Sequence, residues 1–196
     1  MTELPRLLLR CLGVARAEPH TTEAERDGLC RHAAGRRRVV VIGAWQGVTA
    51  ARLRDAMDAA AELLVIDAFS GGRLRAGARR LVARRVVARV ANGSVHWMRA
   101  TGYEVGRAYA ATGKPPVDFV LIDGDTSYGG LSGDWAAWRP LLAPGGIVAL
   151  HDSRSTPQRP IDDAGSVRFT NAVILKDAAF TVVDAIDSLT VLARAR

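Results

Sequence analysis

The sequence predicts an α/β fold of the Rossmann-like, doubly wound type, with a mostly parallel sheet and helices on both faces. Three observations support this. Apolar, β-branched runs alternate with helical stretches from residue 37 to residue 152, the runs are apolar almost throughout, and most of them end at a glycine or an acidic residue. Strands that alternate with helices form parallel sheets, and strands buried on both faces need a continuous apolar sequence.

The expected elements follow one another in order. Strands are expected at 37–43, 62–69, 94–100, 117–124 and 145–152, with helices between them at 47–61, 71–89, 103–113 and 131–142. A polar loop (154–165) and a helix (166–178) then lead to two apolar runs, 180–186 and 188–195. The very short connection between these two runs predicts a C-terminal antiparallel hairpin at the edge of the sheet.

The first 35 residues are expected to form an N-terminal helical segment, followed by one domain over residues 36–196. Thr22 and Glu25 have the spacing of a capping box, which marks the start of a helix. No apolar run approaches the roughly 18 to 20 residues that span a bilayer. The stretch LPRLLLRCLGVA (4–15) contains arginines and no clear cleavage site, so we interpret it as a helix. We therefore expect a cytoplasmic protein that is not associated with a membrane.

The net charge of +7 raises the question of a nucleic-acid partner. The densest basic run, 71–89, carries seven arginines in one expected helix: Arg73, Arg75, Arg79, Arg80, Arg84, Arg85 and Arg89. No aromatic residue lies among them, as a single-strand-binding surface would require. We expect a solvated helix face rather than a phosphate-binding surface. Cys11 and Cys30 lack metal-ligand spacing and are expected to be free thiols.

The residues that follow the first two strands indicate a cofactor with a ribose. Ligands of an open parallel sheet bind beyond the carboxyl ends of its strands. The first strand is followed by Gly43-Ala44-Trp45-Gln46-Gly47, where two glycines allow a tight turn into a helix whose N-terminus offers free N–H groups. Asp67 ends the second strand, and a carboxylate there can bind both ribose hydroxyls. The alternative for Asp67 is a surface acid at a strand end.

Acidic residues also follow the fourth and fifth strands, which should lie side by side. Asp123 and Asp152 would repel each other unless a cation or a shared proton lies between them. Carboxylate oxygens suit Mg²⁺. His151, which fits a transition metal better, and Asp125 flank this point; a packed histidine is the alternative for His151, and Asp125 is expected to cap the loop.

Residues 118–153, DFVLIDGDTSYGGLSGDWAAWRPLLAPGGIVALHDS, resemble the class I S-adenosylmethionine-dependent methyltransferases. The similarity is greatest to small-molecule O-methyltransferases of sugars and natural products, and it extends over about residues 21–195. It implies a binding site for S-adenosylmethionine, with Mg²⁺ as a second cofactor. The cofactor-binding residues implied are Gly43, Ala44, Trp45, Gly47, Asp67, Ala68, Phe69, Thr101 and Asp123. It further implies Asp123, His151 and Asp152 as metal ligands, and His151 and Asp123 as catalytic residues.

The chain departs from the family pattern at three positions. Val41 stands where relatives have an acid that holds the methionine amine, and Thr126 stands where they have a histidine often assigned as the base. His151 stands where some metal-dependent relatives have an acid. The expected function is metal-assisted O-methylation of a hydroxyl on a small molecule or sugar. The alternative is a methyltransferase-fold protein with impaired catalysis that binds a cofactor or a partner.

Two other enzyme classes fit less well. Base-methylating enzymes commonly carry an Asn/Asp-Pro-Pro-aromatic motif after the fourth strand, where this chain has IDGD, so we do not expect a nucleic-acid substrate. Nicotinamide-dependent enzymes need Gly-x-Gly-x-x-Gly at the first turn, which GAWQGV lacks. Trp135 and Trp138, three residues apart, are expected to pack in the core. The N-terminal helices are expected either to cover the pocket or to form the contact of a homo-oligomer.

Overall fold

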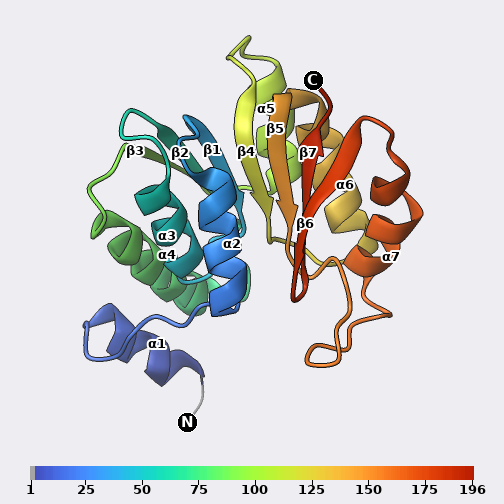
Figure 1. Cartoon of the computed structure of the whole chain (residues 1–196). Helices are drawn as coiled ribbons and strands as arrows, with labels where there is room; N and C mark the ends of the chain where they lie inside the picture. The colour runs from blue at the N-terminus through green and yellow to red at the C-terminus, as the bar shows by residue number, and fades with distance from the viewer. Residues whose placement is uncertain (1–2) are drawn as a thin grey trace.

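The structure of the protein is a computed structural model that describes residues 3–196. It contains one seven-stranded sheet with the strand order β3-β2-β1-β4-β5-β7-β6 (Figure 1). The strands are β1 (Arg38–Ile42), β2 (Glu62–Ile66), β3 (Ser94–Met98), β4 (Val117–Ile122), β5 (Leu142–Leu150), β6 (Phe180–Ile186) and β7 (Leu189–Arg194). Strands β1 to β5 pair in parallel, whereas β7 is antiparallel to both β5 and β6.

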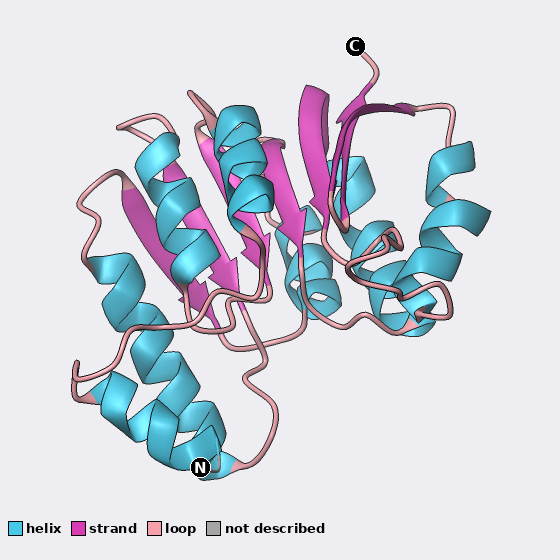
Figure 2. Cartoon of the chain, turned by 60° about the horizontal axis from the view of Figure 1, so that its bottom comes forward, coloured by secondary structure: helices cyan, strands magenta, loops and turns pink. Residues whose placement is uncertain are grey.

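Helices cover both faces of this sheet (Figure 2). The α-helices are α1 (Glu3–Cys11), α2 (Glu23–Ala33), α3 (Val48–Ala56), α4 (Arg73–Ala88), α5 (Gly102–Ala110), α6 (Tyr128–Trp138) and α7 (Gly165–Ala172), and two short 3₁₀-helices lie at Arg139–Leu141 and Ile174–Lys176. Helices α2, α3 and α4 share one buried apolar cluster with the sheet, and α5, α6 and α7 share a second one on the opposite face. The predicted doubly wound fold is therefore confirmed.

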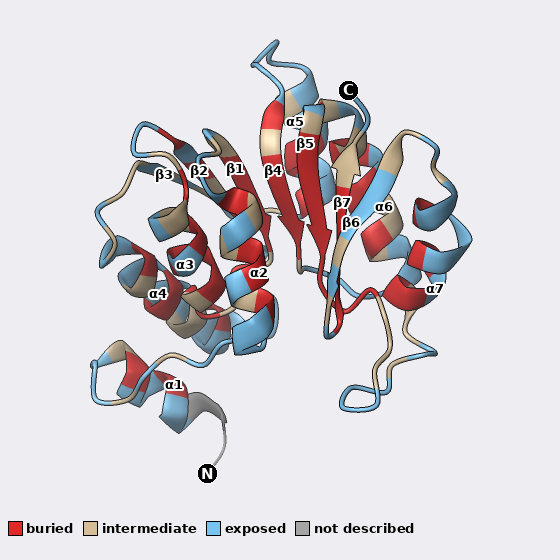
Figure 3. Ribbon diagram, in the orientation of Figure 1, coloured by how far each residue is buried: buried red, intermediate tan, exposed pale blue. Residues whose placement is uncertain are grey.

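The continuous apolar strands are explained by these two clusters (Figure 3). In β1, Val39 and Val41 belong to the cluster under α2 to α4, and Val40 and Ile42 belong to the cluster under α5 to α7. Successive side chains of a strand point to opposite faces, so both sets are buried. Trp135 and Trp138, 4% and 0% exposed, lie in the second cluster, as predicted.

The C-terminal hairpin also forms as predicted, with β7 inside and β6 at the edge of the sheet. Its turn contains Asp187, which adopts a left-handed conformation with φ of 47°. The helix expected at 166–178 is shorter than predicted. It ends at Ala172, because Val173 leaves the helical conformation with φ of −125° and ψ of −58°, and a separate 3₁₀-helix follows.

The N-terminal segment packs against the rest of the chain. Leu7 of α1 is fully buried, and the Cys11 thiol donates to the carbonyl of Ala78 in α4 at 3.5 Å. The capping box of Thr22 and Glu25 at the start of α2 is present, as predicted. No helix within residues 3–196 is both long and apolar enough to cross a membrane.

Candidate active site

Four residues lie directly after the parallel strands, at one edge of the sheet. They are Gly43 after β1, Asp67 after β2, Asp123 after β4 and His151 after β5. Each donates its backbone N–H to the last residue of a neighbouring strand, at 2.8 to 3.1 Å. The parallel register therefore places these four residues in one row, at the edge where open α/β sheets bind ligands.

The turn after β1 requires glycine at both ends. Gly43 has φ of +90°, and a Cβ atom there would lie 2.0 Å from the backbone oxygen of Asp123. Gly47 has φ of +83°, and its Cβ atom would lie 2.6 Å from the backbone oxygen of Ala83 in α4. Both residues thus combine a left-handed conformation with close approach of another backbone.

Asp67 organises this turn through its carboxylate. Oδ2 accepts hydrogen bonds from the backbone N–H groups of Ala44 at 2.8 Å and Trp45 at 3.1 Å, and Oδ1 accepts one from Phe69 at 2.6 Å. A carboxylate has about four acceptor sites, so capacity for a further donor remains. Ala68 is exposed, whereas Phe69 is only 5% exposed and packs in the core.

Thr101 lies beyond β3 and begins α5. Its hydroxyl accepts the backbone N–H of Glu104 at 3.2 Å and donates to the Glu104 carboxylate at 2.8 Å. This capping box occupies the Thr101 side chain. Asp134 of α6 lies nearby, because a Cβ atom on Gly102 would be 2.5 Å from its Oδ1.

Asp123 and His151 form the centre of a buried polar cluster, which also contains His20 and Glu25. His151 Nδ1 lies 2.8 Å from Asp123 Oδ1, and His151 Nε2 lies 3.3 Å from Glu25 Oε2. His20 Nδ1 lies 3.6 Å from the same Asp123 oxygen. The side chains of His151, Glu25 and Asp123 are 1%, 1% and 5% exposed, and that of His20 is 43% exposed.

The two carboxylates determine the charge of His151 when no ion is bound. Burial alone would lower the pKa of His151, but the interactions with Asp123 and Glu25 outweigh it and raise the pKa to about 10. Burial would raise the pKa of Glu25, yet His151, the Thr22 backbone and Ser188 lower it to about 2. The pKa of Asp123 is likewise lowered, since His151 and His20 overcome its burial.

Asp152 lies beside this cluster but is engaged elsewhere. Arg159, from the loop after β5, donates to its two carboxylate oxygens from Nε and Nη2, each at 2.5 Å. Asp152 Oδ1 is 3.7 Å from His151 Nδ1. Asp123 and His151 are therefore in contact, and the Asp152 carboxylate forms an ion pair with Arg159.

Asp125 and Thr126, which the sequence singled out, make contacts within the loops around the site. Asp125 accepts the backbone N–H of Ser127 at 2.9 Å and so caps the loop before α6, as predicted. Thr126 is exposed, and its backbone oxygen accepts the N–H of Ser166 at 2.8 Å.

Four residues of the site were not predicted: His20, Glu25, Asp134 and Arg159. For Glu25 the sequence indicates only a helix cap, although its carboxylate also binds Ser188 and contacts His151. His20 and Arg159 come from irregular segments, whose path no periodicity predicts. Asp134 carried a usable signal, because it is an acid in the otherwise apolar face of the α6 sequence DWAAW.

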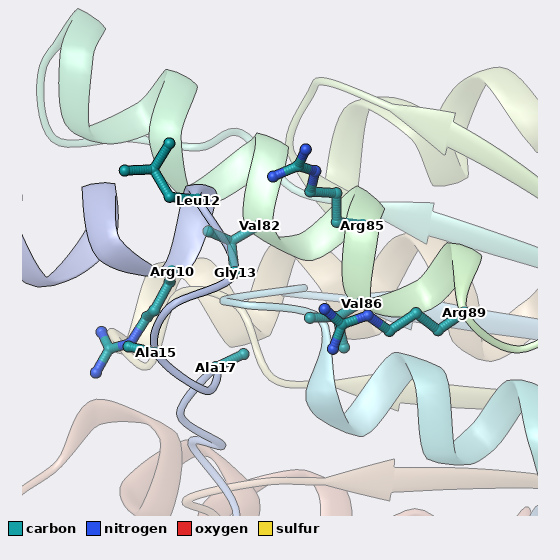
Figure 4. Close-up of a pocket in the computed structure, with 9 residues that line it drawn as sticks. All are labelled: Arg10, Leu12, Gly13, Ala15, Ala17, Val82, Arg85, Val86 and Arg89. Carbon is teal, nitrogen blue, oxygen red and sulfur yellow. The ribbon is translucent and has the colours of Figure 1, made fainter.

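A separate cavity of about 340 Å³ lies between α1 and α4 (Figure 4). Arg10, Arg85 and Arg89 line it together with apolar side chains. Arg10 is already paired with Glu18, and Arg85 donates to the backbone oxygen of Cys11. None of the residues after the strands lines this cavity.

Comparisons with known proteins agree with this architecture. A family described as a methyltransferase domain matches residues 40–153, more than half of the 196-residue chain. No curated protein sequence matches the chain. A solved structure of a Corynebacterium glutamicum protein is similar with a TM-score of 0.70 at 18% identity, over 100% of this chain and 93% of that one.

Two further solved structures are O-methyltransferases. One is TomG from Streptomyces achromogenes, involved in tomaymycin synthesis and solved with S-adenosylmethionine, with a TM-score of 0.66 at 15% identity over 100% of this chain and 91% of that one. The other is a Bacillus cereus enzyme solved with S-adenosylhomocysteine, with a TM-score of 0.64 at 14% identity over 98% and 90%. The family predicted from the sequence is thus confirmed, and the chain belongs to the methyltransferase-domain family of the class I S-adenosylmethionine-dependent enzymes.

Proposed function

We propose that this protein transfers a methyl group from S-adenosylmethionine to a hydroxyl oxygen of a small molecule. The observation that carries the proposal is the row formed by the Gly43–Gly47 turn, Asp67, Asp123 and His151 at one edge of the sheet. Membership of the family supports the reaction class. TomG and the Bacillus cereus enzyme are both O-methyltransferases, which supports oxygen as the acceptor atom.

The cofactor side of the proposed site is built around the glycine turn. S-adenosylmethionine supplies an activated methyl group, so the protein mainly has to position the acceptor oxygen in line with it. In our proposal the backbone at Gly43, Ala44, Trp45 and Gly47 binds the methionine end. Asp67 keeps this turn closed and offers its remaining acceptor capacity to the ribose.

Two more cofactor contacts are proposed at the rim. Ala68 is exposed directly after Asp67, and Thr101 is exposed after β3, where the adenine side of the cofactor is expected. For Phe69, which the sequence also assigned to the cofactor, we propose support of the turn from the core, because its side chain is buried in the apolar cluster.

The acceptor side of the proposed site contains Asp123 and His151. We propose that the acceptor hydroxyl donates a hydrogen bond to Asp123, and that His151 fixes this carboxylate at 2.8 Å. His151 accepts a proton only in its neutral form, which the neighbouring carboxylates of Asp123 and Glu25 disfavour. Thr126 supplies no base, because a hydroxyl group is not deprotonated near neutral pH.

Access to this pair involves the N-terminal segment. The His20 ring lies with its centroid 5.4 Å from those of Trp45 and of His151. We propose that the His20 ring forms one wall of the acceptor's approach to this pair.

A divalent ion completes the proposal. When bound, such an ion would favour the alkoxide form of the acceptor. Asp123 and His151 would hold it, and their facing atoms fit an ion, because both are buried and neither has an aligned hydrogen-bond partner among the described residues. Asp152 could join only by giving up Arg159. The Mg²⁺ expected from the sequence stays a prediction.

Calorimetric titration with S-adenosylmethionine and transfer of its labelled methyl group to a panel of hydroxylated acceptors test the function. We expect binding by the intact chain and at least a tenfold loss of affinity in Asp67→Ala. Asp55→Asn, which changes an exposed acid on α3, serves as the control. Absence of binding at millimolar cofactor would refute the proposal. Binding without transfer to any acceptor would favour the catalytically impaired alternative.

A further inference from the structure

We propose that His20, Asp123 and His151 together bind one divalent transition-metal ion, so that the N-terminal segment completes the metal site. The proposal deepens the function proposed above and depends on it for its catalytic meaning. Its new element is His20, a residue outside the matched family region of 40–153.

The first argument is geometric. One ligand atom from each residue can be chosen so that all three lie within 4.8 Å of one another. Asp123 Oδ1 lies 2.8 Å from His151 Nδ1 and 3.6 Å from His20 Nδ1. Bonds of about 2.0 to 2.2 Å to one ion place neighbouring ligand atoms about 3 to 3.5 Å apart. The two observed separations, 2.8 Å and 3.6 Å, lie just below and just above that range.

The second argument concerns protons. Glu25 is fully buried, and its ionised carboxylate can only accept, so we assign the Nε2 proton of His151 to it across 3.3 Å. In a neutral imidazole the other nitrogen, Nδ1, then carries a lone pair. Asp123 Oδ1, another acceptor, lies 2.8 Å from this nitrogen, out of line for a hydrogen bond. Two acceptors this close need a cation between them, which is either a second proton or a metal ion.

The third argument is that His151 has the support expected of a metal ligand. Ligating histidines usually donate their other ring N–H to a carboxylate or carbonyl group, which fixes the ring and its tautomer. Glu25 has this position, and it is itself held by the backbone N–H of Ser188 at 3.0 Å, the Ser188 hydroxyl at 2.7 Å and the backbone N–H of Thr22 at 2.8 Å.

The donor set indicates the class of ion. Two imidazoles and one carboxylate suit zinc and first-row transition ions such as cobalt or iron, whereas Mg²⁺ prefers oxygen ligands throughout. The carboxylate that would shift the balance toward Mg²⁺ is that of Asp152, and Arg159 binds both of its oxygens. Three protein ligands leave positions open for water or a substrate oxygen.

His20 is held in place by its neighbours in the N-terminal segment. The backbone N–H of Glu18 donates to Gln46 Oε1 at 3.0 Å, and the hydroxyls of Thr21 and Thr49 lie 2.9 Å apart. These contacts anchor both sides of His20 to the turn after β1 and the start of α3. A bound ion would therefore link the N-terminal segment to the ends of β4 and β5.

Titration of the tag-free, EDTA-treated full chain with Co²⁺ tests this, followed by calorimetry and by the visible absorption of the cobalt site. We expect one Co²⁺ per chain and at least 100-fold weaker binding of Mg²⁺. His20→Ala should weaken Co²⁺ binding at least tenfold. Glu25→Gln should weaken it about 10- to 100-fold, as losses of such supporting carboxylates do. His32→Ala is the matched control, because His32 pairs with Asp184 at 3.0 Å away from the site and should leave binding unchanged.

Three results would overturn the proposal: no Co²⁺ bound at millimolar concentration, equal binding by His20→Ala, or Mg²⁺ bound as tightly as Co²⁺. Circular dichroism checks that the variants are folded, and His20 is well suited to substitution because its side chain is 43% exposed. Titration of the same samples with S-adenosylmethionine separates the two proposals. Cofactor binding without Co²⁺ binding would refute the metal site alone.

Discussion

Glu25 and His151 meet in a buried contact, with 3.3 Å between Oε2 and Nε2, although they come from the second helix and the end of the fifth strand. Glu25 also caps α2 and binds Ser188 in the hairpin turn. One carboxylate thus joins the N-terminal segment, the C-terminal hairpin and the candidate active site.

Replacing Glu25 by Gln should therefore destabilise the whole chain. A buried charge left wholly unpaired costs about 3 to 5 kcal/mol; because His151 keeps Asp123 at 2.8 Å, we expect the smaller cost of one lost buried partner, about 1 to 3 kcal/mol. We expect a loss of this size in urea unfolding of the metal-free protein. Glu23→Gln, two residues earlier on an exposed position of the same helix, should change the free energy of unfolding by less than about 0.5 kcal/mol. Equal effects of the two changes would contradict the role of Glu25.

Gly43→Ala should damage the site through the backbone. The new Cβ atom would lie 2.0 Å from the Asp123 oxygen, at a φ of +90°. The strained conformation alone costs about 1 to 3 kcal/mol, and the collision displaces Asp123 as well. We expect lower stability in urea unfolding and weaker S-adenosylmethionine binding by calorimetry.

Gly77→Ala is the control for this change. Gly77 lies in the interior of α4 without a positive φ, and a Cβ atom added there would meet no other atom within 4 Å. Alanine there should stabilise the helix by about 0.5 to 1 kcal/mol. If Gly43→Ala behaved like Gly77→Ala, the close approach of the β1 turn to Asp123 would be refuted.

The sheet and part of the site could be predicted from the sequence for a physical reason. Strands β1 and β4 are buried on both faces, so their apolar runs are unbroken, and the residue after each run lies at the ligand-binding edge. That logic identified Asp67, Asp123 and His151. It could not identify the partners, because Glu25 and His20 reach the site from a segment whose path depends on tertiary contacts.

Asp152 illustrates the same limit: its Oδ1 lies 3.7 Å from the His151 nitrogen that contacts Asp123, yet the sequence did not predict its ion-pair partner. Asp123 and Asp152 follow adjacent strands, as expected, but Asp152 lies two residues beyond the end of β5 with a φ of 50°, and Arg159 binds its carboxylate. A polar loop such as 154–165 has no periodicity from which this ion pair could be read. The metal ligands and the cofactor contacts stay predictions.

Asp134 should make stability depend on pH. Burial raises its pKa from 3.8 to about 6. A carboxyl group with a raised pKa in the folded state contributes stability that is fully present below pH 3.8 and is lost as the pH rises through about 6. A tenfold difference in proton affinity between the folded and unfolded chain corresponds to about 1.4 kcal/mol. Asp134→Asn removes this titration.

Urea unfolding of the chain and of Asp134→Asn at pH 4 and pH 7.5 measures the effect. Relative to Asp134→Asn, the unsubstituted chain should become less stable at the higher pH by a few kcal/mol. Asp55→Asn, which changes an acid at an exposed position, is the control variant. A constant difference for Asp134→Asn would show that Asp134 titrates alike in the folded and unfolded chain.

Arg159→Ala should destabilise the chain because it leaves the Asp152 carboxylate, 6% exposed, without its bidentate partner. The Arg159 side chain is 45% exposed, so we expect a cost of about 1 to 3 kcal/mol, below that of a fully buried pair. Asp152→Asn alone should cost less, because a neutral amide tolerates burial better than an unpaired charge. In the double variant the two effects should not add, and the coupling energy from urea unfolding measures the strength of the ion pair.

Arg154→Ala, at a half-buried position of the same loop, is the control. Strict additivity would mean that the pair contributes nothing, and that Asp152 is free to join the metal ligands beside Asp123.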